Sequence, residues 1–267
     1  MNKGSSLQEA YLSRLEKQRR KIMAARILLA LAFFLLWETA ADRGWIDSFF
    51  FSSPSRLGRL FLSMWRDGSL FLHVGVTLTE TLISFALVVF IGLAVSLLLW
   101  LSDSVFQVLE PYLVILNSLP KSALAPLLIV WLGANQRTII VAGISVAIFG
   151  TILNLYTGFT ETSREKIRLI YTLHGTKKDA LIKVVLPSTV PMIISIMKVN
   201  IGLCLVGVVI GEFIGARNGL GYLIIYGSQV FQLDLVILSI LILCLMAMLL
   251  YGGVTAAEKL YHRRQHA

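Results

Sequence analysis

Six long apolar runs divide this 267-residue chain and constrain its fold more than any other feature. A helix needs about twenty apolar residues to cross roughly 30 Å of hydrocarbon. The runs that reach such a length are residues 24–41, 75–101, 107–132, 137–159, 191–214 and 234–256. Hydrophobic residues make up 57% of the chain, which exceeds the roughly 45–50% of soluble domains. We therefore expect an all-α membrane protein with about six transmembrane helices.

The distribution of Lys and Arg predicts how these helices are oriented, because basic residues are enriched in cytoplasmic loops. Six spans place both termini on one side, together with the loop between the fourth and fifth spans. Most of the basic residues lie in these three segments. We expect an amphipathic cytoplasmic tail at 1–23, a transmembrane domain at 24–258 with a cytoplasmic loop at about 161–190, and a cytoplasmic tail at 259–267.

Several classes of function lack support in the sequence. The net charge of +9 lies mostly in the tails and one loop, without the aromatic-interleaved basic face of a nucleic-acid binder. No phosphate-binding loop of the form G-x-x-x-x-G-K-[ST] occurs, and the His residues lack metal-ligand spacing. Cys204 and Cys244 fall in apolar runs, where we interpret them as small buried hydrophobes. We expect no enzymatic activity, metal or cofactor in this chain.

The loop at 161–190 is the most informative segment. Ile167, Ile170, Tyr171 and His174 are expected on one face of a short helix, Gly175 permits a sharp turn, and a second helix is expected to end at Pro187. This pattern is typical of a helical protrusion that binds in a groove of a partner protein. It is equally typical of a helix pair that lies on lipid, and the pattern alone leaves both interpretations open.

Two further segments do not fit plain spans. Residues 54–68 begin with a helix-opening Pro and carry apolar residues at helical spacing, which predicts a helix along the outer interface. Residues 215–227 are too short to span and rich in Gly, which predicts a re-entrant or surface turn.

Polar residues inside the spans are candidates for the translocation path or its gate, because unpaired polar groups are costly in lipid. Asn117 and Lys121 share a face of the third span, which Pro120 and Pro126 are expected to break. Lys121 either attracts an anion or pairs with a carboxylate or carbonyl.

Three more polar residues belong to this set of candidates. Glu80 lies in one stripe with other polar residues of the second span, and Asn200 is expected near the inner third of the fifth. Glu212, at the outer end of the fifth span, either accepts hydrogen bonds from the glycine-rich turn or forms part of an outer gate.

The loop resembles the cytoplasmic signature of binding-protein-dependent ABC importer permeases, in which Gly and a later Leu-Pro occur where this chain has Gly175 and Leu186-Pro187. The Glu-Ala-Ala positions of that signature are Leu169, Ile170 and Tyr171 here. The similarity covers roughly residues 54–258, and the stretch GVVIGEFIGARNGLGYLI is its most specific part. It points to the nitrate, sulfonate and taurine branch of these permeases.

The resemblance implies a type I permease that pairs with a second permease copy, docks two cytoplasmic ATPases and receives its solute from an extracytoplasmic binding protein. ATP and Mg would then be bound by the ATPase chains. The solute would be a small anion such as a sulfonate, taurine or nitrate; a thiamine- or riboflavin-type vitamin precursor is the alternative. An ATP-independent transporter or channel is the alternative from another class. The implied ATPase-docking residues are Ile167, Leu169, Ile170, Tyr171, Leu173, His174, Gly175, Thr176, Leu186 and Pro187.

Overall fold

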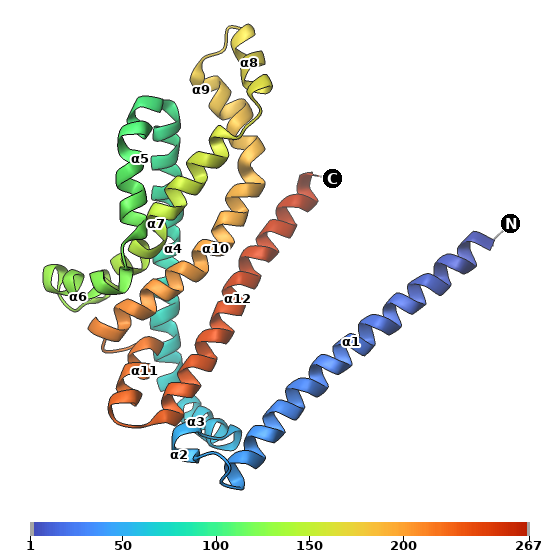
Figure 1. Ribbon diagram of the computed structural model, residues 1–267, viewed down its shortest axis with the longest axis vertical. Coiled ribbons are helices and arrows are strands. Elements are labelled where there is room, and N and C mark those ends of the chain that lie inside the picture. Colours follow the sequence, from blue (N-terminus) through green and yellow to red (C-terminus); the bar gives the residue numbers. More distant parts are fainter. Residues whose placement is uncertain (1–2, 266–267) are drawn as a thin grey trace. The chain divides into compact units, whose positions relative to one another are not determined.

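The computed structural model describes residues 3–265, and this range contains helices and no strand. The elements are α1 (Lys3–Asp42), α2 (Ser48–Phe51), α3 (Pro54–Arg66), α4 (Ser69–Leu101), α5 (Asp103–Ser118), α6 (Lys121–Leu132), α7 (Gln136–Thr160), α8 (Arg164–Thr172), α9 (Lys177–Ala180), the π-helical turn η1 (Leu181–Val185), α10 (Leu186–Gly215), α11 (Leu220–Gln229) and α12 (Leu233–Gln265). Figure 1 labels the helices in this order.

The predicted fold class is confirmed. Five helical stretches are long and apolar enough to cross a membrane: Gln18–Asp42, Ser69–Leu101, Gln136–Thr160, Lys177–Gly215 and Leu233–Tyr261. Helices α5 and α6 form a pair bent by 95°, which supplies a sixth span if the pair is counted as one. Most of the observed helices extend past the apolar runs by several residues, because the flanking polar residues continue the same hydrogen-bond ladder.

The chain divides into two compact units, Met1–Ser63 and Met64–Ala267. In the first unit, α1 continues from the predicted tail into the first span without a break at residue 23. The C-terminal part of α1 is hydrogen-bonded to α2 and to the start of α3. The Trp37 indole donates to the Phe51 carbonyl over 3.2 Å, and the Ser55 N–H donates to Glu38 over 3.0 Å. Residues 1, 2, 266 and 267 of the two predicted tails lie outside the described residues.

The core of the second unit is built around α7, which packs against both α4 and α10. Serine side chains of α4 face α7: Ser84 donates to the Ile140 carbonyl over 3.1 Å, and Ser96 to the Ile152 carbonyl over 3.2 Å. Small residues allow this close approach, as expected for helices packed in a membrane. Buried Cys204 belongs to this core, as predicted, whereas Cys244 is exposed because it lies on an outward face of α12.

Glycines bring α10 and α7 into backbone contact. A Cβ at Gly207 would lie 2.8 Å from the Gly143 Cα and 2.9 Å from the Ala142 carbonyl oxygen. At Gly211 it would lie 3.1 Å from the Ile139 Cα. Helix packing therefore explains these two glycines of α10, whereas Gly202 faces open space.

The predicted break in the third span lies at Pro120, between α5 and α6. Pro126 was expected to break the helix too, and this was wrong: it lies inside continuous α6. The residue before a proline is pushed toward extended backbone, and Leu119 has a ψ of 138°. The span therefore turns sharply at one proline only.

Replacing Gly207 by alanine is expected to lower the free energy of unfolding by about 1–3 kcal/mol, because the new Cβ would overlap backbone atoms that cannot rotate away. Unfolding by sodium dodecyl sulfate in mixed micelles would measure it. Gly202→Ala is the matched control in the same helix, since both variants gain the same helix propensity. Equal stability of the two variants would contradict the packing argument.

Candidate functional site

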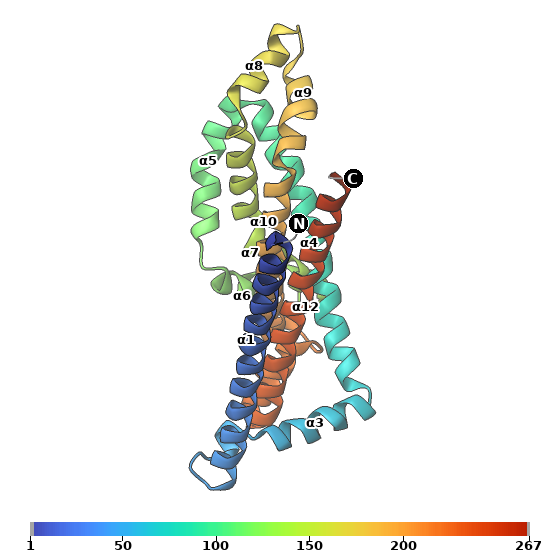
Figure 2. The ribbon, with the colours of Figure 1, turned by 90° about the vertical axis from the view of Figure 1, so that its right-hand side faces the viewer.

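Helices α8 and α9 project at one end of the second unit, beyond the neighbouring end of α5, in both views (Figure 1 and Figure 2). Helix α11 lies toward the opposite end. We call residues 161–190 the coupling loop, since they contain this protrusion. The C-terminal end of α12 points toward the same end of the unit as the coupling loop (Figure 1).

The corner of the coupling loop follows α8. The chain turns at His174, whose φ of 60° lies in the left-handed region. The Gly175 N–H then donates to the Ile170 carbonyl over 2.9 Å. A Cβ at Gly175 would lie 2.8 Å from that same carbonyl oxygen. Glycine is thus required at position 175 because a side chain there would overlap the Ile170 carbonyl. The left-handed backbone conformation of the corner occurs at His174 instead.

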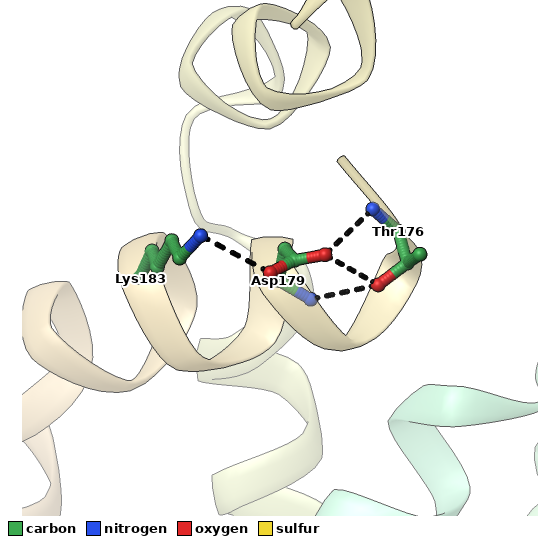
Figure 3. A network of polar contacts seen from close by, with 3 residues as sticks. All are labelled: Thr176, Asp179 and Lys183. Atoms are coloured by element: carbon green, nitrogen blue, oxygen red, sulfur yellow. Dashed lines mark hydrogen bonds and ion pairs between the residues drawn. The ribbon is translucent and has the colours of Figure 1, made fainter. Parts of the chain in front are cut away.

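A capping box starts the helix after the corner (Figure 3). The Thr176 hydroxyl accepts from the Asp179 N–H over 3.3 Å, and Asp179 accepts from the Thr176 N–H over 2.9 Å. Lys183 pairs with the other oxygen of Asp179 over 3.1 Å. These contacts satisfy backbone groups at the helix start and fix the geometry of the corner.

The second helix does not end at Pro187, and that prediction was wrong. Helix α9 passes through the π-helical turn η1 into α10, where Pro187 occupies the first turn. The wider turn gives the Leu186 N–H a bond to the Leu181 carbonyl. The proline is tolerated at this place because the π-helical turn locally changes the hydrogen-bond pattern just before it. Lys177–Gly215 therefore forms one helical stretch of 39 residues.

The side chains of α8 divide into two sets. Ile167 and Ile170 pack against the buried cluster that contains Phe159 and Val185. Leu169, Tyr171 and Leu173 are exposed, with 45% of Tyr171 and 70% of Leu173 accessible. The prediction that Ile167, Ile170, Tyr171 and His174 share one buried apolar face was therefore wrong, because Tyr171 and His174 are exposed.

The base of the coupling loop contacts the junction of α4 and α5. The Lys177 ammonium lies 3.4 Å from an Asp103 carboxylate oxygen and 5.4 Å from the centre of the Trp100 ring. Beneath this exposed pair, Ala180, Leu181 and Val185 join the same buried cluster as Trp100. The buried contacts matter more, because an exposed ion pair contributes little.

Glu212 lies at the end of α10 that is remote from the coupling loop, and it is only 1% exposed. It accepts from the Thr77 hydroxyl over 2.7 Å and from the Gly221 N–H over 2.6 Å. The Leu220 N–H donates to Thr77 over 2.8 Å, and the Gly219 N–H donates to His73 over 3.0 Å. Glu212, Thr77 and His73 together accept hydrogen bonds from the N–H groups of residues 219–221. We call residues 216–221, which comprise the end of the glycine-rich turn and the first residues of α11, the outer turn, after the orientation expected from the sequence.

Glu80 lies one helical turn from Thr77 on α4 and is also 1% exposed. Its carboxyl group lies beside that of Glu212. A cavity of about 260 Å³ adjoins it. The cavity is lined by Val76, Glu80, Ala134, Asn135, Gln136, Ile139, Gly215, Ala216, Arg217 and Asn218.

Asn117 and Lys121 flank the break between α5 and α6. The Lys121 ammonium donates to the carbonyls of Leu116 and of Asn117, the latter over 3.0 Å, and lies 5.5 Å from the Phe149 ring centre. It thus satisfies carbonyls at the end of α5 that the break leaves without helical partners. Of the two roles considered for Lys121, the carbonyl contact is the one that the structure contains.

Asn200 lies in α10, buried between this helix and its neighbours. It lines a cavity of about 10 Å³ with Thr151 and Leu155 of α7, and its Nδ2 has no hydrogen-bond partner. Lys198, two residues before Asn200 in the chain, forms an ion pair with Glu258 of α12. The coupling loop, the outer turn, the α5–α6 break and Asn200 are therefore separate places. Of the predicted path residues, the structure brings together Asn117 with Lys121 and Glu80 with Glu212. Among residues 18–29 and 31–261, whose side chains the structure describes, no group of three or more His, Cys, Asp or Glu side chains could hold a metal ion.

The sequence analysis missed His73 and Thr77 as partners of the outer turn. The polar stripe predicted around Glu80 in the second span consists of Thr77, Glu80 and Ser84, which are all buried. The hydrogen-bond partners of Thr77 are more than 130 positions away in the chain, so spacing within one helix carries no signal for them.

Known proteins are similar to this chain over most of its length. Residues 88–265 match the family of binding-protein-dependent transport system inner membrane components. A probable ABC transporter permease protein of Haemophilus influenzae is 30% identical over 237 residues, covering 89% of this chain and 95% of the relative. The formylaminopyrimidine transport permease ThiX of Halalkalibacterium halodurans is 27% identical, covering 87% and 92%. The taurine permease TauC of Escherichia coli is 25% identical, covering 84% and 83%.

Solved structures share the fold. The MetNI methionine ABC transporter in inward-facing conformations aligns with a TM-score of 0.60 at 19% identity, covering 69% of this chain and 92% of the other. An amino acid ABC transporter aligns with a TM-score of 0.59 at 18% identity, covering 76% and 98%. The family match, the curated relatives and the helical architecture agree. This chain belongs to the family of binding-protein-dependent transport system inner membrane components, the multi-pass permease subunits of type I ABC importers.

Proposed function

We propose that the chain forms, with a second permease copy, the translocation path of an ATP-driven importer, and that the coupling loop receives the motion of a cytoplasmic ATPase. The observation that carries the proposal is the exposed apolar set Leu169, Tyr171 and Leu173 at the end of a protrusion. Large exposed apolar side chains at such a place are typical of a protein interface. In this arrangement both termini and the coupling loop lie in the cytoplasm, as the positive-inside rule favours.

The proposed machinery contains two permease copies, two ATPase subunits with ATP and Mg, and an extracytoplasmic solute-binding protein. The permease itself hydrolyses nothing. Closure of the ATPases displaces α8, and the packing of Ile167 and Ile170 on the core transfers this displacement to the bundle. Because α9, η1 and α10 are one continuous stretch, the displacement also acts directly on the fifth span. A bundle with two stable arrangements then opens to the other side.

The proposed solute is a small anion such as a sulfonate, taurine or nitrate. Similarity to TauC and to aliphatic sulfonate permeases named SsuC supports this class. The alternative of a vitamin precursor is favoured by the similarity to ThiX and to the riboflavin permease RibX of Chloroflexus aurantiacus, which is 27% identical.

Uptake of radiolabelled taurine, nitrate and formylaminopyrimidine by vesicles containing the complete importer would distinguish the two classes of solute. Uptake that persists without the ATPase would contradict the proposal itself.

Replacing Gly175 by valine is expected to uncouple ATP hydrolysis from transport, because the added side chain would displace the corner from the Ile170 carbonyl. Uptake per ATP hydrolysed should fall by about tenfold, which corresponds to about 1.4 kcal/mol of coupling. ATPase activity and uptake would be measured in the same vesicles. Gly253→Val in α12, where nothing lies within 4 Å, is the control. Unchanged coupling in the Gly175 variant would defeat this role of the corner.

Replacing Leu173 by glutamate is expected to weaken ATPase binding by about tenfold or more, since a charge would be buried in the proposed interface. Leu173 is exposed, so the isolated permease should remain folded. Co-purification and binding kinetics with the ATPase would measure the effect. Leu260→Glu, at a similarly exposed leucine of α12, is the matched control. If both variants bind the ATPase equally well, Leu173 is not part of the interface.

A further inference from the structure

A row of exposed polar side chains runs along α5 and continues on α7, which packs beside it (Figure 1). On α5, Gln107, Glu110 and Asn117 follow at steps of three and seven residues, which places them along one face of the helix. On α7, Asn154 and Thr157 are three residues apart and share a face in the same way. We call these five residues the polar seam.

The two amides of the polar seam lie at the depth of the hydrocarbon core. Asn117 reaches α7 at Gly150, where a Cβ would lie 3.2 Å from the Asn117 Oδ1. Asn154 follows Gly150 by one helical turn. The span Gln136–Thr160 has Ile148 at its middle, so Gly150 lies about 3 Å and Asn154 about 9 Å from the middle along the helix axis. Both values are smaller than half the hydrocarbon thickness, which is about 15 Å.

Lipid cannot satisfy these amides. Within the part of the chain whose side chains are described (18–29 and 31–261), the side chains of Asn117 and Asn154 form no hydrogen bond. Polar groups inside spans generally face the interior of the bundle or a water-filled cavity, because hydrocarbon offers them no partner. These two amides are exposed, so the interior of the bundle does not cover them. Water or a second permease copy is therefore needed to satisfy them.

The charge of the polar seam favours water over a dry contact between two copies. Glu110 lies two helical turns before Asn117 and is exposed, and no ion pair to it occurs among the side chains that the structure describes. Lys121 already donates to two carbonyls at the α5–α6 break. In a two-fold symmetric pair the same patch of each copy meets the other. A dry contact of this kind would bury the Glu110 carboxylate without a free cation, which is costly.

We propose that the polar seam lines the aqueous translocation path, and that the amides of Asn117 and Asn154 hydrogen-bond to the solute as it passes. An amide both donates and accepts, so it can replace water molecules around a solute of either charge. The inference rests on the proposed function, since such a path forms between two permease copies. It assigns the α5–α7 face to this path and the opposite face of α5 to lipid.

Cysteine labelling in the complete importer tests this assignment. The exposed Cys244 is first replaced by serine, whereas the buried Cys204 is kept. Asn117→Cys and Asn154→Cys are then treated with a charged, membrane-impermeant methanethiosulfonate in nanodiscs, which leave both membrane faces open to the reagent. The control is Ile115→Cys, two residues before Asn117 on the opposite side of α5 and 60% exposed. Both seam variants should react about tenfold faster than the control, because the reactive thiolate is disfavoured in hydrocarbon.

Oxidative cross-linking of the same variants identifies what covers the seam if labelling is slow. Equal labelling of the seam variants and of Ile115→Cys would overturn the proposal. A disulfide between the two copies would then assign the seam to a dry dimer contact, since it requires the two Cα atoms to lie within about 7 Å. Equal labelling without a disulfide would assign the seam to lipid.

Modification after assembly tests the contact with the solute without affecting folding. A bulky benzyl methanethiosulfonate attached to Asn117→Cys should abolish uptake, because the added group would obstruct the path. The same group on Ile115→Cys should leave uptake unchanged, since that side chain faces lipid in this assignment. Uptake that survives complete modification of Asn117→Cys would overturn the solute contact.

Uptake by the unmodified importer separates this inference from the function on which it rests. ATP-dependent uptake combined with equal labelling of Asn117→Cys and Ile115→Cys would overturn the polar seam and leave the importer function standing. Uptake that persists without the ATPase would contradict the importer function, whatever the labelling rates are.

Discussion

The need to pair every backbone N–H and C=O group away from water governs this structure, because unsatisfied groups in hydrocarbon cost several kcal/mol each. Long helices satisfy it internally, and three of the places where the ladder is interrupted have specific solutions. Lys121 donates to the carbonyls at the end of α5. Glu212, Thr77 and His73 accept from the outer turn. The π-helical turn η1 accommodates Pro187. Lys121 and Glu212, two ionisable groups inside the spans, thus have a structural explanation before any functional one is needed.

Sequence reasoning succeeded where the signal is local and physical. Apolar run lengths predicted the spans, and Gly175 with Leu186-Pro187 identified the coupling loop and, by resemblance, the family. It failed where the outcome depends on tertiary contacts. Pro126 and Pro187 were assigned breaks because proline lacks a donor, yet both lie within helical stretches. Helical periodicity placed Tyr171 with Ile170, but only packing determines which side of a short helix faces the core. The contact between Glu80 and Glu212 joins residues 132 positions apart, for which a single sequence gives no signal.

Exposure of apolar side chains has two meanings in this chain. On the long spans, exposed leucines and phenylalanines lie on surfaces that lipid would cover, so their exposure does not indicate a protein interface. At the coupling loop the same chemistry occurs beside Arg164, Glu165, Lys166 and Arg168, which belong in water or at a headgroup surface. Apolar residues interleaved with charges on a protrusion fit a protein groove better than hydrocarbon. This contrast favours docking over a lipid-bound helix pair.

The uninterrupted stretch Lys177–Gly215 has a consequence for how the two faces of the membrane communicate. At 1.5 Å per residue, its 39 residues extend about 58 Å, which exceeds the thickness of a bilayer. One end begins at the corner of Gly175, and the other carries Glu212, which holds the outer turn. In the proposed importer, a tilt imposed at the coupling-loop end would displace the other end in the opposite sense about the α7 crossing, where Gly207 lies close to Gly143. The helix would act as a lever with its pivot in the core, so the outer turn could respond without a relay of intermediate side chains.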